Sequence, residues 1–397
     1  MPILSRIAEF HAEMMAWRHD LHAHPEMAFK EHRTSDFVAA KLTEFNIPID
    51  CGLAGTGVVG TLRCGSGERA IALRADMDAL PIHEKTGRAH SSTHEGIMHA
   101  CGHDGHTTML LGAARYLAET RNFDGTVHFV FQPAEENECG GQAMVEAGLF
   151  TRFPVEAVYG MHNWPGVSVG AFAVRSGPIM AADDKFEITI TSRGAHAAMP
   201  HLGDDAIVAA GALIGAIQTI ASRIVDPQEE VVVSLTQLHG GNTWNVIPEQ
   251  VVLRGTCRYF NPMLRQVLES ALRRISEGVA AAHGVKVAFA YRKPIPPAVN
   301  AEHPTETAAH AAALVAGQSN VHRDLAPSMG CEDFAFMLAA RPGCYVWIGN
   351  GPTSDGRSLH SARYDFNDEI LPLGASYWCT LVESALRQGA AILENKT

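Results

Sequence analysis

Hydrophobic positions in the first part of the chain recur in short runs that alternate with helical patterns. Residues 3–44 have a helical pattern with an interruption around residues 22–27, where Pro25 forbids a smooth helix interior. Further helical patterns cover about 104–120 and 141–149, and the apolar runs lie at 58–63, 70–75, 126–132 and 155–161. Buried strands that alternate with helices predict an α/β domain with a central sheet flanked by helices.

The pattern changes at about residue 184. The segment KFEITITS alternates with period two, and Asp204 and Asp205 then lead into a long apolar helix. Two strands, EVVVSLTQLH and QVVLRGTCRYF, precede a helix that begins at Asn261 and Pro262 and stops at Gly284, and VKVAFAY is the last strand. The order β-α-β-β-α-β is that of a ferredoxin-like module. We therefore expect residues 184–294 to be a domain inserted into one α/β domain made of residues 1–183 and 295–397.

Length and charge narrow the class of protein. At 397 residues the chain has the length of roughly two to three domains. Its 43 acidic residues outnumber its 31 lysines and arginines, and the net charge of −12 argues against non-specific binding to nucleic acid or to an anionic membrane. No segment reaches the roughly 18 continuous apolar residues of a membrane helix, and the start lacks the pattern of a signal peptide. We therefore expect a cytoplasmic protein without a nucleic-acid or membrane partner.

Cysteine and histidine usage points toward metal chemistry. The eight cysteines are scattered through a chain far larger than those that depend on disulfides, so most of them are expected to be buried reduced thiols. The 21 histidines are more unusual, because a surplus of imidazole is useful mainly for metal binding or for proton transfer near neutral pH. A surplus alone identifies no site.

A glycine pattern at residues 55–60, GTGVVG, matches the dinucleotide-binding fingerprint literally. That fingerprint needs a strand before the glycines and a helix after them, so that the pyrophosphate lies at the helix N-terminus. Here the glycines precede a strand. We interpret the segment as a turn into that strand.

Potential ligands gather in the segments that follow the predicted strands. ADMDALP follows the strand at 70–75, QPAEEN follows the strand at 126–132, and MHNWPG follows the strand at 155–161. Between the first two lies HACGHDGH, which leads into a helix. Because sites in open α/β sheets form outside the carboxyl ends of the strands, we expect these loops to converge.

Five side chains offer a mixture of nitrogen, oxygen and sulfur ligands: Cys101, His103, Glu136, His162 and His360. This mixture suits Zn, Mn, Co or Ni rather than Ca or Mg. Five ligands are more than one closed tetrahedral site needs. The sequence therefore predicts two adjacent divalent metal ions with a bridging water.

Alternatives remain open for the reactive residues. If Glu136 binds metal, Glu135 is available to take a proton from metal-bound water, but a pair of consecutive glutamates is also typical of a solvated loop. Cys101 could be a small buried apolar residue. It could also be a thiol nucleophile paired with His103, although residues two apart in a turn are poorly placed for that pairing.

Four further residues near the predicted ligands have two possible roles. Asp76 and Asp78 could orient a metal-bound imidazole, or they could cap a loop. His99 and His106 could support a ligand in the same way, or they could pack in the core or lie at the surface. The sequence does not decide between these roles.

Taken together, the motifs resemble the M20 metallopeptidase family, and specifically its amidohydrolase branch, which contains hippurate hydrolases, aminoacylases and auxin-conjugate hydrolases. The matching segments span nearly the whole chain: RHDLHAHPE (18–26), ADMDALP (75–81), HACGHDGH (99–106), QPAEEN (132–137), GMHNWPG (160–166), GAHAAMP (194–200), NVIPE (245–249) and CEDFAF (331–336). The resemblance implies a catalytic α/β domain interrupted by a ferredoxin-like lid or dimerisation domain. This organisation agrees with the insertion expected from the pattern.

The resemblance also implies a role for each matching residue. The five ligand candidates would bind a dinuclear metal centre, and Glu135 would act as the general base and then as the acid. In the lid, His196 and Asn245 would hold the scissile carbonyl and the developing oxyanion, within one chain or across a dimer interface. Without the family, His196 would be interpreted as a loop histidine. The branch commonly has Ser where Cys331 stands, which leaves the surroundings of Glu332 open.

The expected reaction is hydrolysis of the amide bond of N-acyl amino acids by metal-activated water, in a homodimer or a higher homo-oligomer. A metallo-dipeptidase of the same family is one alternative, and it would need an acidic partner for the free α-amino group of its substrate. A non-catalytic metal-binding or sensing protein is another. Glu135 argues against it, because storage of metal needs no additional base.

Overall fold

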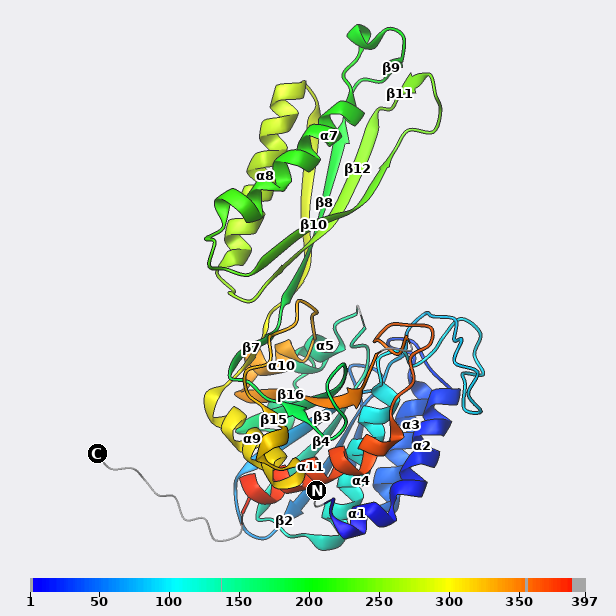
Figure 1. The fold of residues 1–397 in the computed structure, drawn as a ribbon, viewed down its shortest axis with the longest axis vertical. Helices are drawn as coiled ribbons and strands as arrows, with labels where there is room; N and C mark the ends of the chain where they lie inside the picture. Colours follow the sequence, from blue (N-terminus) through cyan, green and yellow to red (C-terminus); the bar gives the residue numbers. More distant parts are fainter. Residues whose placement is uncertain (1–2, 137, 354–355, 388–397) are drawn as a thin grey trace, which may run out of the picture. The chain divides into compact units, whose positions relative to one another are not determined.

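The computed structural model describes residues 3–136, 138–353 and 356–387, and the contacts divide the chain into two compact units (Figure 1). Unit 1 draws on Met1–Ile179, Val299–Ala326 and Asp333–Thr397, and unit 2 draws on Met180–Ala298 and Pro327–Glu332. The expected insertion, residues 184–294, lies within unit 2. The later segment joins unit 2 because the backbone N–H of Ala181 donates to the carbonyl oxygens of Ser328 and Gly330.

An eight-stranded sheet with the order β1-β2-β4-β3-β5-β16-β6-β15 forms the centre of unit 1. β3 pairs in parallel with β4 and β5, and β5 pairs in parallel with β16. β2 is antiparallel to both of its neighbours. The strands are β1 (Ile49–Leu53), β2 (Gly57–Cys64), β3 (Ala70–Asp76), β4 (Gly125–Gln132), β5 (Ala157–Pro165), β6 (Phe172–Ala173), β15 (Val321–His322) and β16 (Gly343–Gly351).

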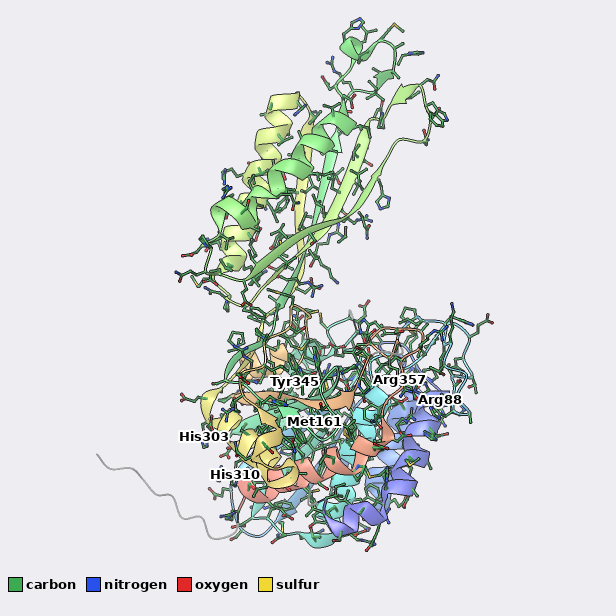
Figure 2. The ribbon with its side chains drawn as sticks, viewed as in Figure 1. Arg88, Met161, His303, His310, Tyr345 and Arg357 are labelled. Atoms are coloured by element: carbon green, nitrogen blue, oxygen red, sulfur yellow. The ribbon has the colours of Figure 1, made fainter. Side chains whose placement is uncertain are left out.

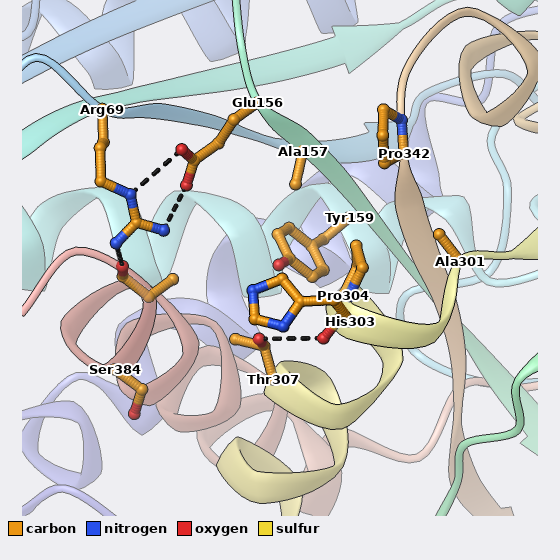
Figure 3. Close-up of a pocket in the computed structure, with 11 residues that line it drawn as sticks. Arg69, Glu156, Ala157, Tyr159, Ala301, His303, Pro304, Thr307, Pro342 and Ser384 are labelled. Atoms are coloured by element: carbon orange, nitrogen blue, oxygen red, sulfur yellow. Dashed lines mark hydrogen bonds and ion pairs between the residues drawn. The ribbon is translucent and has the colours of Figure 1, made fainter. Parts of the chain in front are cut away.

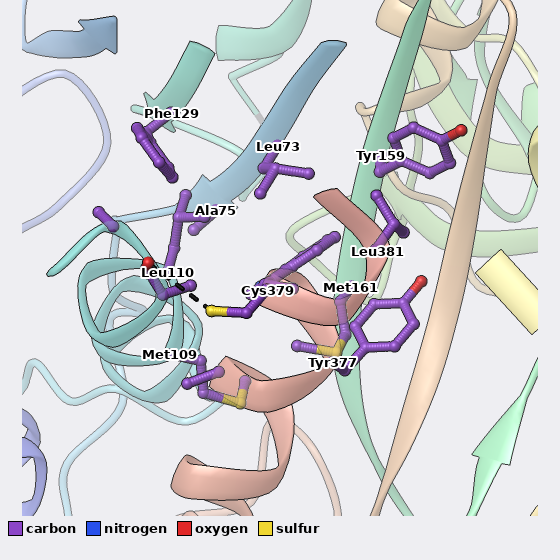
Figure 4. Close-up of a cluster of buried hydrophobic side chains, with 14 of the residues drawn as sticks. Leu73, Ala75, Met109, Leu110, Phe129, Tyr159, Met161, Tyr377, Cys379 and Leu381 are labelled. Carbon is purple, nitrogen blue, oxygen red and sulfur yellow. Dashed lines mark hydrogen bonds between the residues drawn. The ribbon is translucent and has the colours of Figure 1, made fainter. Parts of the chain in front are cut away.

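Alternate residues of the central strands point to opposite faces of this sheet. Leu73 of β3 and Phe129 of β4 belong to the large hydrophobic core, together with residues of α4 and α11 (Figure 4). Arg74 is also buried, and its guanidinium lies 5.6 Å from the ring centroid of Phe334, just before α10. Burial of both faces explains the continuous apolar runs in the sequence.

The helices of unit 1 come from both ends of the chain. α4 contacts α2 and α11, α9 contacts α11, and α5 contacts α10. The bounds are α1 (Ser5–Glu9), α2 (His11–Ala23), α3 (His32–Glu44), α4 (His103–Thr120), α5 (Gly140–Glu146), α6 (Leu149–Arg152), α9 (Glu302–Ala316), α10 (Ala335–Ala340) and α11 (Leu371–Ala385), with 3-10 turns at Gln318–Asn320 and Asp368–Ile370.

The structure confirms the predicted α/β class and also corrects three local expectations. Of the glycines of GTGVVG, which were expected to precede a strand, only Gly55 does so, whereas Gly57 begins β2 and Gly60 lies within it, in an antiparallel part of the sheet. β5 continues to Pro165, so His162 lies inside a strand rather than in the loop after it. β16 was not expected from the sequence, although it is buried along its whole length beside β5.

Unit 2 has the predicted β-α-β-β-α-β order. Its four-stranded sheet has the order β10-β12-β8-β13, and α7 and α8 pack against the sheet. Asp205 caps α7 by accepting hydrogen bonds from the backbone N–H groups of Ile207 and Val208. The second helix, α8, begins at Leu264, which is later than Asn261 and Pro262 suggested. The elements are β8 (Ala182–Thr191), α7 (Ala206–Ile217), β10 (Val231–Gly240), β12 (Gln250–Tyr259), α8 (Leu264–His283) and β13 (Lys286–Ile295).

Shorter elements complete the described fold. In unit 2, β9 (Ala195–His196) pairs with β11 (Val246–Ile247), and a 3-10 turn covers Pro200–Leu202. β7 (Gly177–Met180) pairs with β14 (Ala298–Asn300).

One helical stretch in the described residues is long and apolar enough to cross a membrane by length and composition alone. It runs over Ala206–Ile224, which is α7 and the π-helical turn Ile220–Ile224 that follows it. Leu213 and Ile217 of this stretch are buried in the core of unit 2. A core helix passes the same test, so the stretch is weak evidence for a membrane span.

Candidate metal centre

The five predicted ligands come together in unit 1 at the carboxyl ends of its central strands. Cys101 lies two residues before α4, and His103 is the first residue of that helix. Glu136 follows β4, and His162 lies near the end of β5. His360 comes from the segment after β16 and is held by a 2.8 Å hydrogen bond from its backbone N–H to the carbonyl oxygen of Ala100.

The ligand atoms form two overlapping groups. Sγ of Cys101 lies 3.3 Å from Nε2 of His162, and these atoms form one group with His103 in which all ligand atoms lie within 4.8 Å of one another. Sγ of Cys101 also forms a second group, by the same criterion, with Glu136 and His360. In that group Nε2 of His360 lies 3.2 Å from Oε1 of Glu136. Two groups that share a thiol have the arrangement expected for two adjacent ions.

The donor atoms themselves fit a metal centre. Both ring nitrogens of His103 and Oε1 of Glu136 are buried, and within the described part of the chain their charged neighbours lie 3.2–3.7 Å away without the geometry of a hydrogen bond. Leaving a buried polar atom without a hydrogen bond costs about 1–3 kcal/mol. Metal coordination would satisfy these atoms, and the mixed N, O and S set suits a first-row transition metal or zinc.

The electrostatic environment of His103 favours positive charge. Nδ1 of His103 lies 3.3 Å from Oδ1 of Asp78, and its Nε2 lies 3.7 Å from Oδ2 of Asp76. Burial by itself would lower the pKa of His103, but the two carboxylates outweigh burial and raise this pKa to about 10. The same negative potential attracts a metal cation.

In contrast to His103, the surroundings of His162 favour the neutral form of its ring. Burial lowers its pKa well below the usual value, and the neighbouring His106 lowers it further. Its Nδ1 lies 2.7 Å from the carbonyl oxygen of Asn163, which is an acceptor, so the proton of the neutral ring resides on Nδ1. Nε2 is therefore left with its lone pair toward Cys101, as a metal ligand requires.

Glu135 lies beside the two groups. Its Oε2 is 4.0 Å from Nε2 of His103, and its side chain is 11% exposed. The side chain of Glu136 is 9% exposed, so the solvated-loop interpretation of this pair is wrong. Asp78 holds both residues, because its carboxylate oxygens accept the backbone N–H groups of Glu135 at 3.0 Å and of Glu136 at 2.9 Å.

Sequence reasoning missed part of the hydrogen-bonded support beneath the centre. Nδ1 of His106 lies 2.6 Å from Oδ1 of Asp76, and its Nε2 lies 2.7 Å from Oδ1 of Asn163. The side-chain amide of Asn163 donates to the hydroxyl of Tyr364 at 2.6 Å. His106 is thus a buried supporting residue rather than a surface residue. Asn163 could have been found from its position next to His162 in the GMHNWPG motif.

The RHDLHAHPE motif also supports the centre from α2. Arg18 is 1% exposed, and its guanidinium makes two hydrogen bonds to the carboxylate of Asp368, of 2.8 and 3.0 Å. Nδ1 of His22, one turn later, lies 2.8 Å from Oδ2 of Asp104, the residue after His103. The motif therefore holds the first turn of α4 and the segment that follows His360.

The two residues assigned to the lid by resemblance lie together in unit 2. His196 pairs with Val246 across β9 and β11, and the backbone N–H of Ala197 donates to the carbonyl oxygen of Asn245 at 2.9 Å. Nδ1 of His196 accepts the backbone N–H of Ala198 at 3.1 Å. The neutral ring of His196 therefore carries its proton on Nε2.

The other residues singled out from the sequence have structural surroundings of their own. His99 is buried, and burial lowers its pKa to about 4. Glu332 is 2% exposed, and Sγ of Cys331 lies 4.0 Å from Oδ2 of Asp183 within unit 2. All eight cysteines are free thiols, and five of them are buried, in agreement with the expectation for most of them.

A cavity of about 540 Å³ lies in unit 1 near the amino ends of the strands, opposite the ends that carry the ligand candidates (Figure 3). Residues that precede or begin the strands contribute to its lining, among them Ala157 and Pro342. Arg69 and Glu156 form an ion pair at this cavity. It lies away from the converging metal-ligand candidates, which follow the strands.

Comparison with known proteins places this geometry in a family. The model of the peptidase family M20/M25/M40 matches residues 72–384. The chain belongs to the M20/M25/M40 family. This M20 chain is 37% identical over 387 residues to hippurate hydrolase from Campylobacter jejuni, with coverage of 98% of the chain and 100% of the relative. It is also 39% identical to N-acetylcysteine deacetylase from Bacillus subtilis, with coverage of 94% and 96%.

A solved structure has the same architecture. The M20 chain matches the crystal structure of a dinuclear metal-binding peptidase of the M20 family from Bacillus subtilis with a TM-score of 0.83 and 36% identity. The match covers 96% of this chain and 99% of that structure. It supports the fold class expected from the sequence, an α/β domain interrupted by an inserted lid.

Proposed function

We propose that this protein is a metal-dependent amidohydrolase that cleaves the amide bond between an acyl group and the nitrogen of an amino acid. The observation that carries the proposal is the pair of overlapping ligand groups that share Cys101, with the carboxylate of Glu135 beside them. The relatives support the substrate class, because hippurate hydrolase and N-acetylcysteine deacetylase are named for N-acyl amino acids.

The five ligand candidates, Cys101, His103, Glu136, His162 and His360, would hold two divalent ions. When bound, these ions supply Lewis acidity that makes water a nucleophile near neutral pH. Glu135 accepts the proton of the attacking water and returns it to the leaving nitrogen. Asp78 positions Glu135 through its backbone N–H, which keeps the carboxylate beside His103.

His196 and Asn245 bind the substrate carbonyl and stabilise the developing oxyanion. Their hydrogen-bonding states suit this role. Nδ1 of His196 accepts a backbone N–H, so Nε2 is the donor. Oδ1 of Asn245 accepts the hydroxyl of Thr243 at 3.2 Å, so its amide nitrogen is the group that donates to an oxyanion.

Three finer points belong to the same proposal. The ions are Zn, Mn, Co or Ni, the protein works as a homodimer or a higher homo-oligomer, and it is cytoplasmic. Activity after reloading with each metal, light scattering of the purified protein and cell fractionation test these points separately.

The decisive test is the variant Glu135→Gln together with a substrate comparison. We expect this variant to retain its bound metal and to lose about 10²- to 10⁴-fold in kcat on benzoyl-glycine. Near-normal turnover would contradict the role of Glu135. The wild type should hydrolyse benzoyl-glycine faster than glycyl-glycine, and the reverse order would make the protein a dipeptidase. Absence of any amidase activity in metal-loaded protein would favour a metal-binding protein without catalysis.

A further inference from the structure

A small cavity of about 130 Å³ in unit 1 has an unusual concentration of positive charge. Its lining consists of Lys85, Thr86, Arg88, Arg357, Arg363 and Asp365. Four of these six side chains are cationic, although acidic residues outnumber lysine and arginine by 43 to 31 in the chain. Arg88 and Arg357 are labelled in Figure 2, at the same edge of unit 1.

Among the described residues that line the cavity, Asp365 is the one carboxylate, and other cations already engage it. Oδ2 of Asp365 pairs with Nε of Arg88 at 3.0 Å. Its Oδ1 accepts from Nη1 of the buried Arg18 at 3.3 Å and lies 3.2 Å from Nε2 of His90. Lys85 and Arg363 make no ion pair within the described residues, so positive charge remains at the cavity, and clustered like charges are stabilised by a bound counter-ion.

The size of the cavity restricts what can fill it. Its volume of about 130 Å³ corresponds to about four water molecules at roughly 30 Å³ each. A carboxylate or a tetrahedral oxyanion such as phosphate or sulfate fits this space. Arg363 suits this chemistry, because the planar guanidinium can donate two parallel hydrogen bonds to a carboxylate or phosphate.

The cavity is connected to the metal centre through the backbone. His360 lies between Arg357 and Arg363 in the sequence, and the backbone N–H of Lys85 donates to the carbonyl oxygen of Ala362 at 2.7 Å. This hydrogen bond joins the two segments that line the cavity. Ala362 is two residues from His360, which is a predicted metal ligand. An anion held between their side chains would restrict the segment that carries His360.

We propose that this cavity is an anion-binding site that takes one carboxylate or one tetrahedral oxyanion and thereby fixes the segment that carries His360. The anion has two possible sources. One is a free inorganic anion, and the other is a second carboxylate on the substrate, as in an N-acyl derivative of an acidic amino acid. Only the substrate source rests on the proposed function, because binding of a free anion does not require turnover.

Calorimetric titration of the metal-loaded full-length protein with sulfate tests the site directly. We expect saturable binding to the wild type and binding weaker by about tenfold in Arg363→Gln and in Lys85→Gln, because each variant removes one charged donor. The matched control is Arg323→Gln, which removes an exposed arginine that pairs with Glu306 away from this cavity. Equal binding in all four proteins, or no binding to the wild type, would overturn the proposal.

Two further measurements distinguish the sources of the anion. If the anion is part of the substrate, the ratio of kcat/KM for N-acetylglutamate to that for N-acetylglutamine should fall about tenfold in Arg363→Gln and stay unchanged in Arg323→Gln. If it is a free anion, sulfate should slow the release of metal to a chelator in the wild type but not in Arg363→Gln. If neither quantity depends on Arg363, the coupling to His360 is refuted even where sulfate binds.

Discussion

Sγ of Cys101 lies 3.3 Å from Nε2 of His162, although 61 positions separate the two residues in the sequence. The contact forms because Cys101 precedes α4, which packs against β3, while His162 lies on β5, the parallel neighbour of β3. Because parallel strands run in the same direction, residues at their carboxyl ends lie together at one end of the strands. The distance is short enough for one ion to contact both atoms.

Replacement of either member of this pair should deplete the metal. We expect Cys101→Ser and His162→Ala to bind fewer ions per chain than the wild type, as measured by atomic emission after dialysis, because each removes a ligand from the shared group. His310→Ala is the control, since His310 is an exposed histidine on α9 (Figure 2). A metal content equal to that of the control would remove the residue from the ligand set.

Asp78 should matter although it is not assigned as a ligand. Its two carboxylate oxygens accept backbone N–H groups of Glu135 and Glu136, and Oδ1 also lies beside Nδ1 of His103. Asn has only one acceptor oxygen, so Asp78→Asn should weaken metal binding by about 10- to 100-fold and lower the free energy of unfolding by about 1–3 kcal/mol. Competition with a chelator and urea unfolding measure these effects, with exposed Asp36→Asn as the control.

Arg18 should be essential for stability. Its buried guanidinium pairs with Asp368 and Asp365, so Arg18→Met leaves buried negative charge without its cation. Removal of one partner from a buried ion pair costs about 3–5 kcal/mol. Urea unfolding of the metal-free protein should reveal a loss of this size. Arg323→Met, which breaks a more exposed pair, should change stability far less. Similar losses in the two variants would contradict the role of Arg18.

The contribution of His22 to stability should decrease as the pH rises. Burial by itself would lower the pKa of His22, but hydrogen bonds to Asp104 and Glu84 outweigh burial and raise this pKa to about 9 from an ordinary 6.5. The stabilisation, roughly 3 kcal/mol, is complete below pH 6.5 and is lost as the pH rises through 9. The difference in free energy of unfolding between wild type and His22→Gln should therefore be larger at pH 6 than at pH 10. A constant difference would contradict this assignment.

Local sequence patterns were sufficient to predict the class of the fold and the candidate ligands. The alternation in β8 and the cap at Asp205 are short-range signals, and the structure contains both. β16 was missed although residues 344–348 are an unbroken apolar run, because three glycines flank this short run within the strand. The true end of β5 was missed for a related reason, since pairing with β16 extends it through His162 to Pro165.

The amino-acid sequence by itself determined which side chains this protein can offer to a metal and which segments follow its strands, because residue type and periodicity are local properties. Tertiary structure decided which of those side chains meet. The sharing of Cys101 between two ligand groups, the support of His106 by Asp76 and Asn163, and the buried pairing of Arg18 with Asp368 all join residues far apart in the chain. Their proximity depends on strand order and helix packing, which no local pattern encodes.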